Sequence, residues 1–306
     1  MEIHRFLVSV NCSLPNDREI TDGVQDHECL YTDHGFLILP DTYTHDGEKT
    51  RLVIYCHGAG GTVTTDDSQV EHTAITQYLV ANGFAVMDVN GLPERFAAER
   101  GIDIRNNVGS LIALRCYVKA YHYCMDHFNL KSDVFVHGSS MGGISSTNLV
   151  LSGMIPVIAQ TGFCPVLDTY NEIFLKPWGG GLPKAALGKI YDFAMDKNGE
   201  YIYDAEKVCG CNPAINDKRK SYPVPVKFWH CVDDPIVSFA VTEKFVNTIK
   251  AGGGIAYLRP FPYGGHEPQQ VGKPVVRPSG NDILNGKRLE ITPAVEEAFV
   301  WIRNFD

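Results

Sequence analysis

The stretch that decides the fold is DVFVHGSSMGGI, residues 133–144. Its first part, residues 134–136, is a short apolar run of branched and aromatic residues, which favours a buried strand. Glycines and serines follow at once, and a helical pattern begins near Ile144. We therefore predict a strand, a sharp turn and a helix in direct succession, with Ser140 at the turn.

The turn carries the pattern G-x-S-x-G, formed by Gly138, Ser140 and Gly142. This pattern often arises by chance, but it is far less common between a Val/Phe strand and a helix. Small neighbours let the backbone make a strained turn without side-chain clashes, so the serine hydroxyl projects above the sheet at the helix N-terminus. We predict that Ser140 is a nucleophile. Ser139, in the variable position, is expected only to pack or to form a local hydrogen bond.

Similar apolar runs recur along the chain, short and mostly not alternating, at 35–39, 52–56, 85–89, 157–159, 226–229 and 255–258. Continuous apolar strands indicate burial on both faces, as in a parallel sheet covered by helices. Helical spacing of three and four lies between them, for example at Leu111, Leu114 and Val118. A last helix is predicted with Thr292 as N-cap and Pro293 in its first position. This alternation predicts an α/β fold with a doubly wound, mostly parallel sheet and helices on both faces.

No linker, charge block or internal repeat divides the 306 residues, so we expect one domain spanning 1–306. Residues of about 165–222 break the alternation and contain helical patterns only at 184–195 and 204–208. We interpret this segment as a small lid or cap inserted between two strands, since loops this long tend to be functional. The alternative is an ordinary surface excursion. Residues 1–50 are expected to add antiparallel strands, with a polar excursion at 22–33.

Composition narrows the class of protein. The content of hydrophobic residues, 44%, can form a large core, and a net charge of -9 disfavours nucleic-acid binding, which needs a basic surface. No apolar run approaches the roughly 18 residues of a membrane helix, and the first residues lack a signal-peptide pattern, so a soluble cytoplasmic protein is expected unless a signal was removed. Oligomeric state cannot be read from these features.

Cysteine usage favours a reducing compartment, because the nine cysteines are an odd set without C-x-x-C spacing. Cys209 and Cys211 resemble half a metal site, but no second Cys/His pair follows at a fitting distance. No metal is expected.

A serine nucleophile needs a neighbouring base that is itself oriented by an acid. After the run 226–229 the chain reads HCVDDPIV, and after the run ending near 258 it reads FPYGGH, which ends at His266. His266 is the expected base because it combines a late position, a preceding glycine pair and a flanking loop. Asp233 and Asp234 compete for the acid, and Asp168, after an earlier strand, is a third candidate.

Two other histidines, His137 and His230, end predicted strands and are expected to be packed residues hydrogen-bonded to backbone. A second glycine-rich turn, HGAGG at 57–61, follows the run 52–56. No lysine follows it as a phosphate-binding P-loop requires. It is instead where an oxyanion hole is expected, with His57 bracing the turn.

In acyl transfer, each backbone N–H aimed at the developing oxyanion is worth about 3 kcal/mol. One donor is expected from Met141, the residue after the nucleophile, and the other from Ala59 or Gly60.

Together these residues resemble the α/β-hydrolase superfamily, and within it the branch of esterases and prolyl-oligopeptidase-like enzymes that includes acetyl xylan esterases, feruloyl esterases and polyester hydrolases. The resemblance rests on HGAGG at 57–61, GSSMGG at 138–143, DPIV at 234–237 and GGH at 264–266. The order Ser140, Asp234, His266 is that of the superfamily. Asp234 is preferred over Asp233 because the loop that it opens has the commoner form in the family.

The resemblance implies hydrolysis in two steps through an acyl-enzyme, without a metal or an organic cofactor. The sequence differs from the peptidase relatives in carrying no N-terminal propeller, which makes peptidase activity a weaker expectation. We expect a short-acyl or feruloyl ester of a carbohydrate as substrate, bound by Trp178, Arg95 and Arg105 beside the predicted edge of the sheet. The arginines have an alternative role in surface ion pairs. The rival functions are a peptidase or amidase and a catalytically silent hydrolase-like binding protein.

Overall fold

The computed structural model describes residues 1–13, 30–176, 178–274, 283–284 and 287–306. A sheet of eight strands crosses it in the order β1-β2-β4-β3-β5-β6-β7-β8. The strands are β1 (Glu2–Asn11), β2 (Leu30–Leu39), β3 (Leu52–Cys56), β4 (Ala85–Val89), β5 (Val134–Ser139), β6 (Val157–Phe163), β7 (Val226–Cys231) and β8 (Ala256–Phe261). A separate hairpin joins β9 (Ile283–Leu284) to β10 (Lys287–Arg288).

Strand direction confirms the mostly parallel sheet. β1 and β2 pair antiparallel and β2 is antiparallel to β4, whereas β4, β3, β5, β6, β7 and β8 run parallel. β3 and β4 have the predicted bounds, and β5, β6, β7 and β8 each extend beyond their apolar run. The expected polar excursion at 22–33 is wrong at its end, because 30–33 belong to β2 and Asp33 is buried. Its remainder, 22–29, lies outside the described residues.

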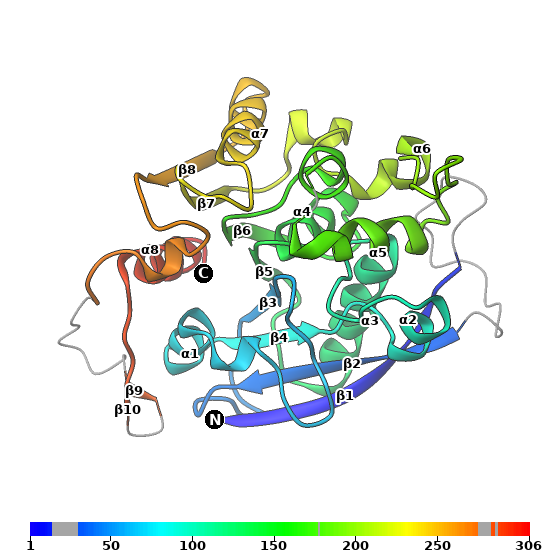
Figure 1. The fold of residues 1–306 in the computed structure, drawn as a ribbon. Helices are drawn as coiled ribbons and strands as arrows, with labels where there is room; N and C mark the ends of the chain where they lie inside the picture. The colour runs from blue at the N-terminus through cyan, green and yellow to red at the C-terminus, as the bar shows by residue number, and fades with distance from the viewer. Residues whose placement is uncertain (14–29, 177, 275–282, 285–286) are drawn as a thin grey trace.

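Helices cover both faces of the sheet, as predicted (Figure 1). Side chains alternate along β3: Leu52, Ile54 and Cys56 belong to one core and Val53 and Tyr55 to the other, which explains why the run is apolar throughout. The helices that contribute to the first core are α2 (Glu94–Arg100), α3 (Leu111–His127), α4 (Gly142–Ser152), α5 (Leu182–Ile190), α6 (Ala205–Val208) and α7 (Phe239–Ala251), while α1 (Ala74–Ala81) and α8 (Pro293–Arg303) form the second.

Helix α8 begins at Pro293 with Thr292 in the N-cap position, as expected. The side chain makes no capping bond, and the Thr292 hydroxyl donates to the carbonyl of Gln269, 2.6 Å away. Thr292 thus joins the helix to the segment that follows His266.

The segment between β6 and β7 contains a π-helical turn at Thr169–Phe174, followed by α5 and α6. Both predicted helical patterns are present, but α5 ends at Ile190, well before 195, because Asp192 adopts a left-handed backbone conformation, φ 48°. The segment is anchored to the sheet layer: the Tyr191 hydroxyl accepts from the N–H of Leu111 at the start of α3, and Asn148 of α4 donates to the carbonyl of Cys211. We call the segment from Cys164 to Pro225 the insertion.

Among the helices that the structure describes, none is long and apolar enough to cross a membrane. The seven cysteines whose side chains it describes are all buried. The side chain of Cys209 lies outside the described residues, so the expectation about the Cys209 and Cys211 pair stays a prediction.

Gly142 sets how closely α4 approaches β3, and we predict that Gly142→Ala destabilises the fold. A Cβ there stands 1.9 Å from the carbonyl oxygen of Cys56 and 2.6 Å from that of His57, and neither backbone atom can turn away. The expected loss is about 1–3 kcal/mol of unfolding free energy, as for other overpacked sites. Thermal or denaturant unfolding measures it. Asn247→Ala, exposed on α7, is the control and is expected to stay within about 0.5 kcal/mol. Equal stability of both variants would contradict the prediction.

Candidate active site

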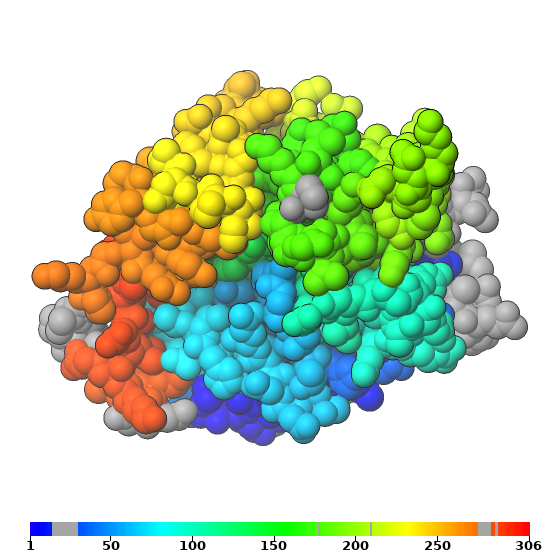
Figure 2. Space-filling model, in the orientation of Figure 1, coloured from blue at the N-terminus to red at the C-terminus, as the bar shows by residue number. Residues whose placement is uncertain are grey.

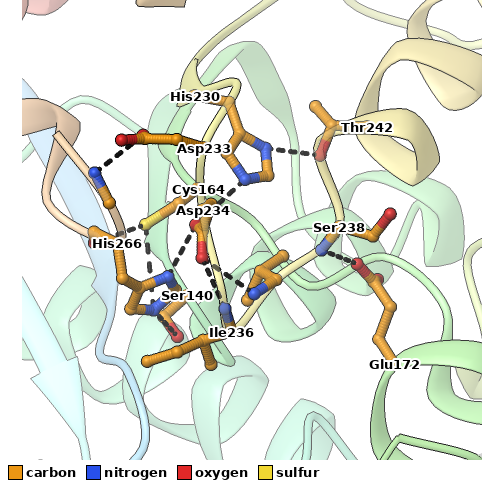
Figure 3. A network of polar contacts seen from close by, with 12 residues as sticks. Ser140, Cys164, Glu172, His230, Asp233, Asp234, Ile236, Ser238, Thr242 and His266 are labelled. Carbon is orange, nitrogen blue, oxygen red and sulfur yellow. Dashed lines mark hydrogen bonds and ion pairs between the residues drawn. The ribbon is translucent and has the colours of Figure 1, made fainter. Parts of the chain in front are cut away.

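The carboxyl ends of the parallel strands meet at one edge of the sheet, and the loops that leave them gather the candidate residues. Ser140 follows β5, Cys164 follows β6, His230 and Asp234 lie at and after the end of β7, and His266 follows β8. Figure 3 shows Ser140, Cys164 and Asp234 around the imidazole of His266, with His230 contacting Asp234 and Thr242. A site built in this way uses rigid strands to fix groups that are distant in sequence.

Ser140 occupies the predicted turn between β5 and α4 with a left-handed backbone, φ 52°. Such a conformation costs a non-glycine residue about 1–3 kcal/mol and persists only where the surroundings impose it. Here its N–H donates to the carbonyl of Phe163 at 2.9 Å, and its carbonyl accepts from the N–H of Val166 at 2.8 Å. The end of β6 and the start of the insertion therefore hold the turn from both sides.

The three residues predicted as a triad lie in one chain of hydrogen bonds. Nε2 of His266 is 2.8 Å from Oγ of Ser140, and Nδ1 is 2.8 Å from Oδ2 of Asp234. With the Nδ1 proton donated to the carboxylate, Nε2 is the nitrogen that accepts the serine proton. The side chain of Asp234 is fully buried and that of His266 is 18% exposed, so the base faces the open side of the site.

Asp234 is held as a carboxylate by four donors. Oδ1 accepts from the N–H groups of Ile236 and Val237 at 2.8 and 3.0 Å, and Oδ2 accepts from His230 as well as from His266. Burial alone would raise the pKa of Asp234, but these hydrogen bonds hold the pKa well below its ordinary value. Asp234 is therefore ionised throughout the neutral range.

The other two candidate acids make different contacts. Asp233 accepts from the N–H groups of Gly265 and Gly264 at 2.9 and 3.3 Å, and so fixes the backbone that carries His266. Asp168 caps the π-helical turn by accepting from the N–H of Tyr170 at 3.0 Å. In the described part of the chain, neither carboxylate is hydrogen-bonded to His266.

The expectation that His137 and His230 bond to backbone is wrong for both. His230 is fully buried, with Nδ1 2.9 Å from the hydroxyl of Thr242 in α7 and Nε2 3.1 Å from Oδ2 of Asp234. His137 lies 2.8 Å from the hydroxyl of Thr161, and burial lowers the pKa of His137 to about 3. The reason is geometric: backbone groups in a parallel sheet are already paired, so a buried imidazole must find side-chain partners. Asp234 thus bridges two histidines.

The glycine-rich turn at 57–61 lies against Ser140, since a Cβ on Gly58 would stand 3.2 Å from Cβ of Ser140. Of the expected donors, Gly60 is already engaged, because its N–H donates to the carbonyl of Arg105 at 3.3 Å. The N–H groups of Ala59 and Met141 donate to no acceptor within the described residues. This geometry favours Ala59 over Gly60 as the partner of Met141.

His57 sits beneath that turn in a buried ion pair. Its Nδ1 is 2.8 Å from Oδ2 of Asp88, and Tyr117 donates to the other carboxylate oxygen at 2.7 Å. Burial alone would lower the pKa of His57, but the charge of Asp88 outweighs it and raises the pKa. The contacts are those of a brace for the glycine-rich turn.

Two residues of the site were not identified by sequence reasoning. Cys164 directly follows β6, and its Sγ lies 3.9 Å from Nε2 of His266 and 3.3 Å from the carbonyl oxygen of His266. Glu172 is buried in the π-helical turn and accepts from the N–H groups of Leu167 and Ser238. Their only signal in the sequence was a nucleophilic or acidic side chain shortly after an apolar run.

The residues proposed for substrate binding are more dispersed. Arg95 pairs with Glu99 and Arg105 pairs with Asp103, and both guanidinium groups are more than half exposed, as surface ion pairs are. Trp178 is partly buried, and its Nε1 has no hydrogen-bond partner within the described residues. Figure 2 shows where the insertion, in green, meets the segment around Asp234 and His266, in yellow and orange, above the loop of 57–70, in light blue.

No protein-family model matches the chain, and no curated protein matches it in sequence. Solved structures do match in fold. The acylaminoacyl peptidase of Pyrococcus horikoshii shares 14% identity with a TM-score of 0.64, over 99% of this chain and 41% of that one. A puromycin-hydrolyzing peptidase of Mycobacterium tuberculosis shares 16% identity with a TM-score of 0.58, over 75% and 33%.

Est1E from Butyrivibrio proteoclasticus shares 17% identity with a TM-score of 0.57, over 90% of this chain and 96% of that one. The chain therefore spans about two fifths or less of the peptidases but nearly all of Est1E. These likenesses confirm the predicted fold: the chain has the α/β-hydrolase fold.

Substitution of each candidate acid by asparagine separates their contributions. Asp234→Asn is expected to lower kcat by roughly 10⁴, because the amide favours the wrong tautomer of His266. Asp168→Asn leaves the imidazole contacts intact and is expected to retain most of the rate, while Asp233→Asn loosens the His266 loop and takes an intermediate value. Turnover with one chromogenic ester measures all three. Nearly full turnover of Asp234→Asn would show that the acid is assigned wrongly.

Glu172 is expected to make stability depend on pH. Burial raises the pKa of Glu172 to about 7, against hydrogen bonds from Leu167, Asp168 and Ser238 that lower it. The pKa of Glu172 in the folded state lies above its unfolded value, so protonation of Glu172 stabilises the fold. This stabilisation is fully present below about pH 4.5 and is lost as pH rises through about 7. Glu172→Gln, which mimics the protonated acid, should therefore gain melting temperature relative to the parent between pH 5 and 8. A constant difference in Tm across that range would exclude this role.

Proposed function

We propose that the chain is a serine hydrolase that cleaves carboxylic esters with Ser140, His266 and Asp234. The observation that carries the proposal is the continuous contact from acid to base to nucleophile, with both hydrogen bonds at 2.8 Å and the serine on a strained strand-to-helix turn. A serine held in this way needs no further activation, because its proton acceptor is already in place.

The geometry supports a two-step reaction. Oγ of Ser140 attacks the ester carbonyl while Nε2 of His266 takes its proton, and the same imidazole then protonates the departing alcohol. Water attacks the acyl-enzyme with His266 again as base, which regenerates the serine. Asp234 stabilises the imidazolium in both steps, and the N–H groups of Ala59 and Met141 stabilise the oxyanion. The reaction uses no metal and no organic cofactor.

For the substrate we propose a short-acyl or feruloyl ester of a carbohydrate. A cavity of about 540 Å³ in the insertion supports an aromatic or sugar ring as one part of it, and its lining is Tyr170, Phe174, Ile202, Tyr203, Ala205, Asn212 and Ile215. The polar groups of Tyr203 and Asn212 are bonded to each other and to Asp168 and Thr169, so the cavity offers mainly ring faces and apolar surface. Rings of this kind stack on sugars and on aromatic acyl groups.

Trp178 is the other residue kept in this proposal, because its buried indole N–H has no hydrogen-bond partner within the described residues. Arg95 and Arg105 are weaker candidates, since Glu99 and Asp103 already pair with them. Arg105 does act on the site through its backbone, whose carbonyl accepts from Gly60.

A peptidase or amidase is the second candidate, and the likeness to an acylaminoacyl peptidase and to a puromycin-hydrolyzing peptidase favours it. The same triad serves both reactions, because the leaving group is protonated by His266 in either case. A hydrolase-like binding protein without turnover is the third.

A fluorophosphonate probe tests the mechanism. The parent protein is expected to gain one adduct by intact mass, and Ser140→Ala to gain none and to lose at least about 10³ in kcat. Ser139→Ala is the matched control, because Ser139 bonds to Tyr55 and not to His266, and it should still be labelled. An unlabelled parent protein, or labelling that survives in Ser140→Ala, would refute the assigned nucleophile.

A substrate panel then separates the candidates. Acetylated and feruloylated oligosaccharides are compared with aminoacyl amides and with p-nitrophenyl esters of increasing chain length. Hydrolysis of the carbohydrate esters, with acetate faster than long chains, is the expected result. Faster cleavage of the amides would support the peptidase, and equal or faster cleavage of long-chain esters would exclude a short-acyl preference.

A further inference from the structure

Cys164 is held against the base of the triad. Its thiol is 2% exposed, and its Sγ lies 3.9 Å from Nε2 of His266 while donating to the carbonyl of His266 at 3.3 Å. Its backbone N–H donates to the carbonyl of Trp229 in β7 at 2.8 Å. These two hydrogen bonds hold the side chain and the backbone of Cys164, so the thiol is not a mobile surface group. The proposed reaction does not use it.

Two further donor atoms lie near Nε2 of His266, Sγ of Cys164 and Oγ of Ser140. Zinc binds sulfur at about 2.3 Å and imidazole nitrogen at about 2.0–2.1 Å, so the two ligand atoms of one tetrahedral ion lie roughly 3.5 Å apart. The observed 3.9 Å between Sγ and Nε2 is close to that separation. Oγ of Ser140, 2.8 Å from the same nitrogen, is a third donor, and the His266 side chain is 18% exposed, so an ion can reach it from solvent.

The second nitrogen of the imidazole is arranged as metal sites require. A histidine ligand almost always donates its other N–H to a carboxylate or carbonyl, which fixes the tautomer and raises the basicity of the ligating nitrogen. Nδ1 of His266 donates to Asp234 at 2.8 Å, and Asp234 is fully buried. Cys164, Asp234 and His266 together offer ligand atoms that all lie within 4.8 Å of one another.

Charge favours a cation at this place and selects its type. Asp234, hydrogen-bonded to His266, and Glu267, next to His266 in the chain, both carry negative charge. The same negative charges attract a divalent ion. Only an ion with high affinity for sulfur can displace the thiol proton, so zinc and cadmium are favoured and magnesium and calcium are not.

We propose that Cys164 and His266, with Ser140 completing the set, form a binding site for a thiophilic divalent cation such as Zn²⁺, which reversibly blocks the active site. The ion occupies the lone pair of Nε2, so His266 can no longer accept the serine proton. Binding stands on the geometry of the donors alone. The inhibition that follows from it rests on the proposed function.

Cadmium reports the binding directly, because a Cd²⁺–thiolate bond absorbs in the ultraviolet whether or not the protein is an active hydrolase. The parent protein in its reduced form is expected to show this band on titration with Cd²⁺, and Cys164→Ala to lose it. Cys211→Ala is the matched control and should keep the band, because Cys211 is another buried thiol and lies outside the proposed donor set. A band that survives in Cys164→Ala, or vanishes in Cys211→Ala, would overturn the site.

Inhibition is measured separately, as the Zn²⁺ concentration that halves each variant's own metal-free rate. Cys164→Ala is expected to need at least about ten-fold more Zn²⁺ than the parent protein, the effect typical of losing a partner at a metal site. Mg²⁺ should not inhibit, and a chelator should restore the rate. A cadmium band without turnover on any substrate would refute the proposed function but not the site. Turnover with equal zinc sensitivity in both proteins would refute inhibition through Cys164.

Discussion

The site depends on one constraint, the reversal of the chain at Ser140 within a single residue. That reversal needs a left-handed backbone at Ser140 and two neighbours without side chains. A Cβ on Gly138 would stand 2.2 Å from the hydroxyl of Ser146, and a Cβ on Gly142 would overlap the carbonyl of Cys56. With both glycines in place, α4 packs against β3 and β5, and its first free N–H, that of Met141, lies beside the nucleophile. The strain at Ser140 is sustained by the packing of the whole parallel sheet.

The two adjacent aspartates after β7 both hold His266 in place, by different contacts. Asp234 accepts from the imidazole of His266, whereas Asp233 accepts from the N–H groups of Gly264 and Gly265 just before it. The base is thus positioned twice, at its ring and at its backbone. His230 adds a third fixed point, because it joins Asp234 to Thr242 in α7. Hydrogen-bonded support of this kind is what keeps a catalytic geometry within a fraction of an ångström.

The sequence predicted the parallel sheet and the residues of the candidate triad because both produce local sequence patterns. β3 and β4 are apolar from end to end, and Ser140 and His266 lie in glycine-marked turns after such runs. The remaining contacts join residues that no local pattern links. Cys164 meets His266 across 102 positions, and the N–H of Gly60 is taken by Arg105, which follows a different strand. Periodicity reports which face of an element is buried, but it carries no information about which loop ends will touch.

The insertion contacts the candidate site at its very beginning. The N–H of Val166 donates to the carbonyl of Ser140, and Glu172 accepts from Ser238 directly after the acid loop. The first ten residues of the insertion therefore touch the loops of both the nucleophile and the acid. A displacement of this stretch would therefore shift the loops of Ser140 and Asp234 together. The cavity at Tyr203 is lined by Tyr170 of this stretch as well as by residues farther along, so the stretch that contacts the loops of Ser140 and Asp234 also forms part of the cavity wall.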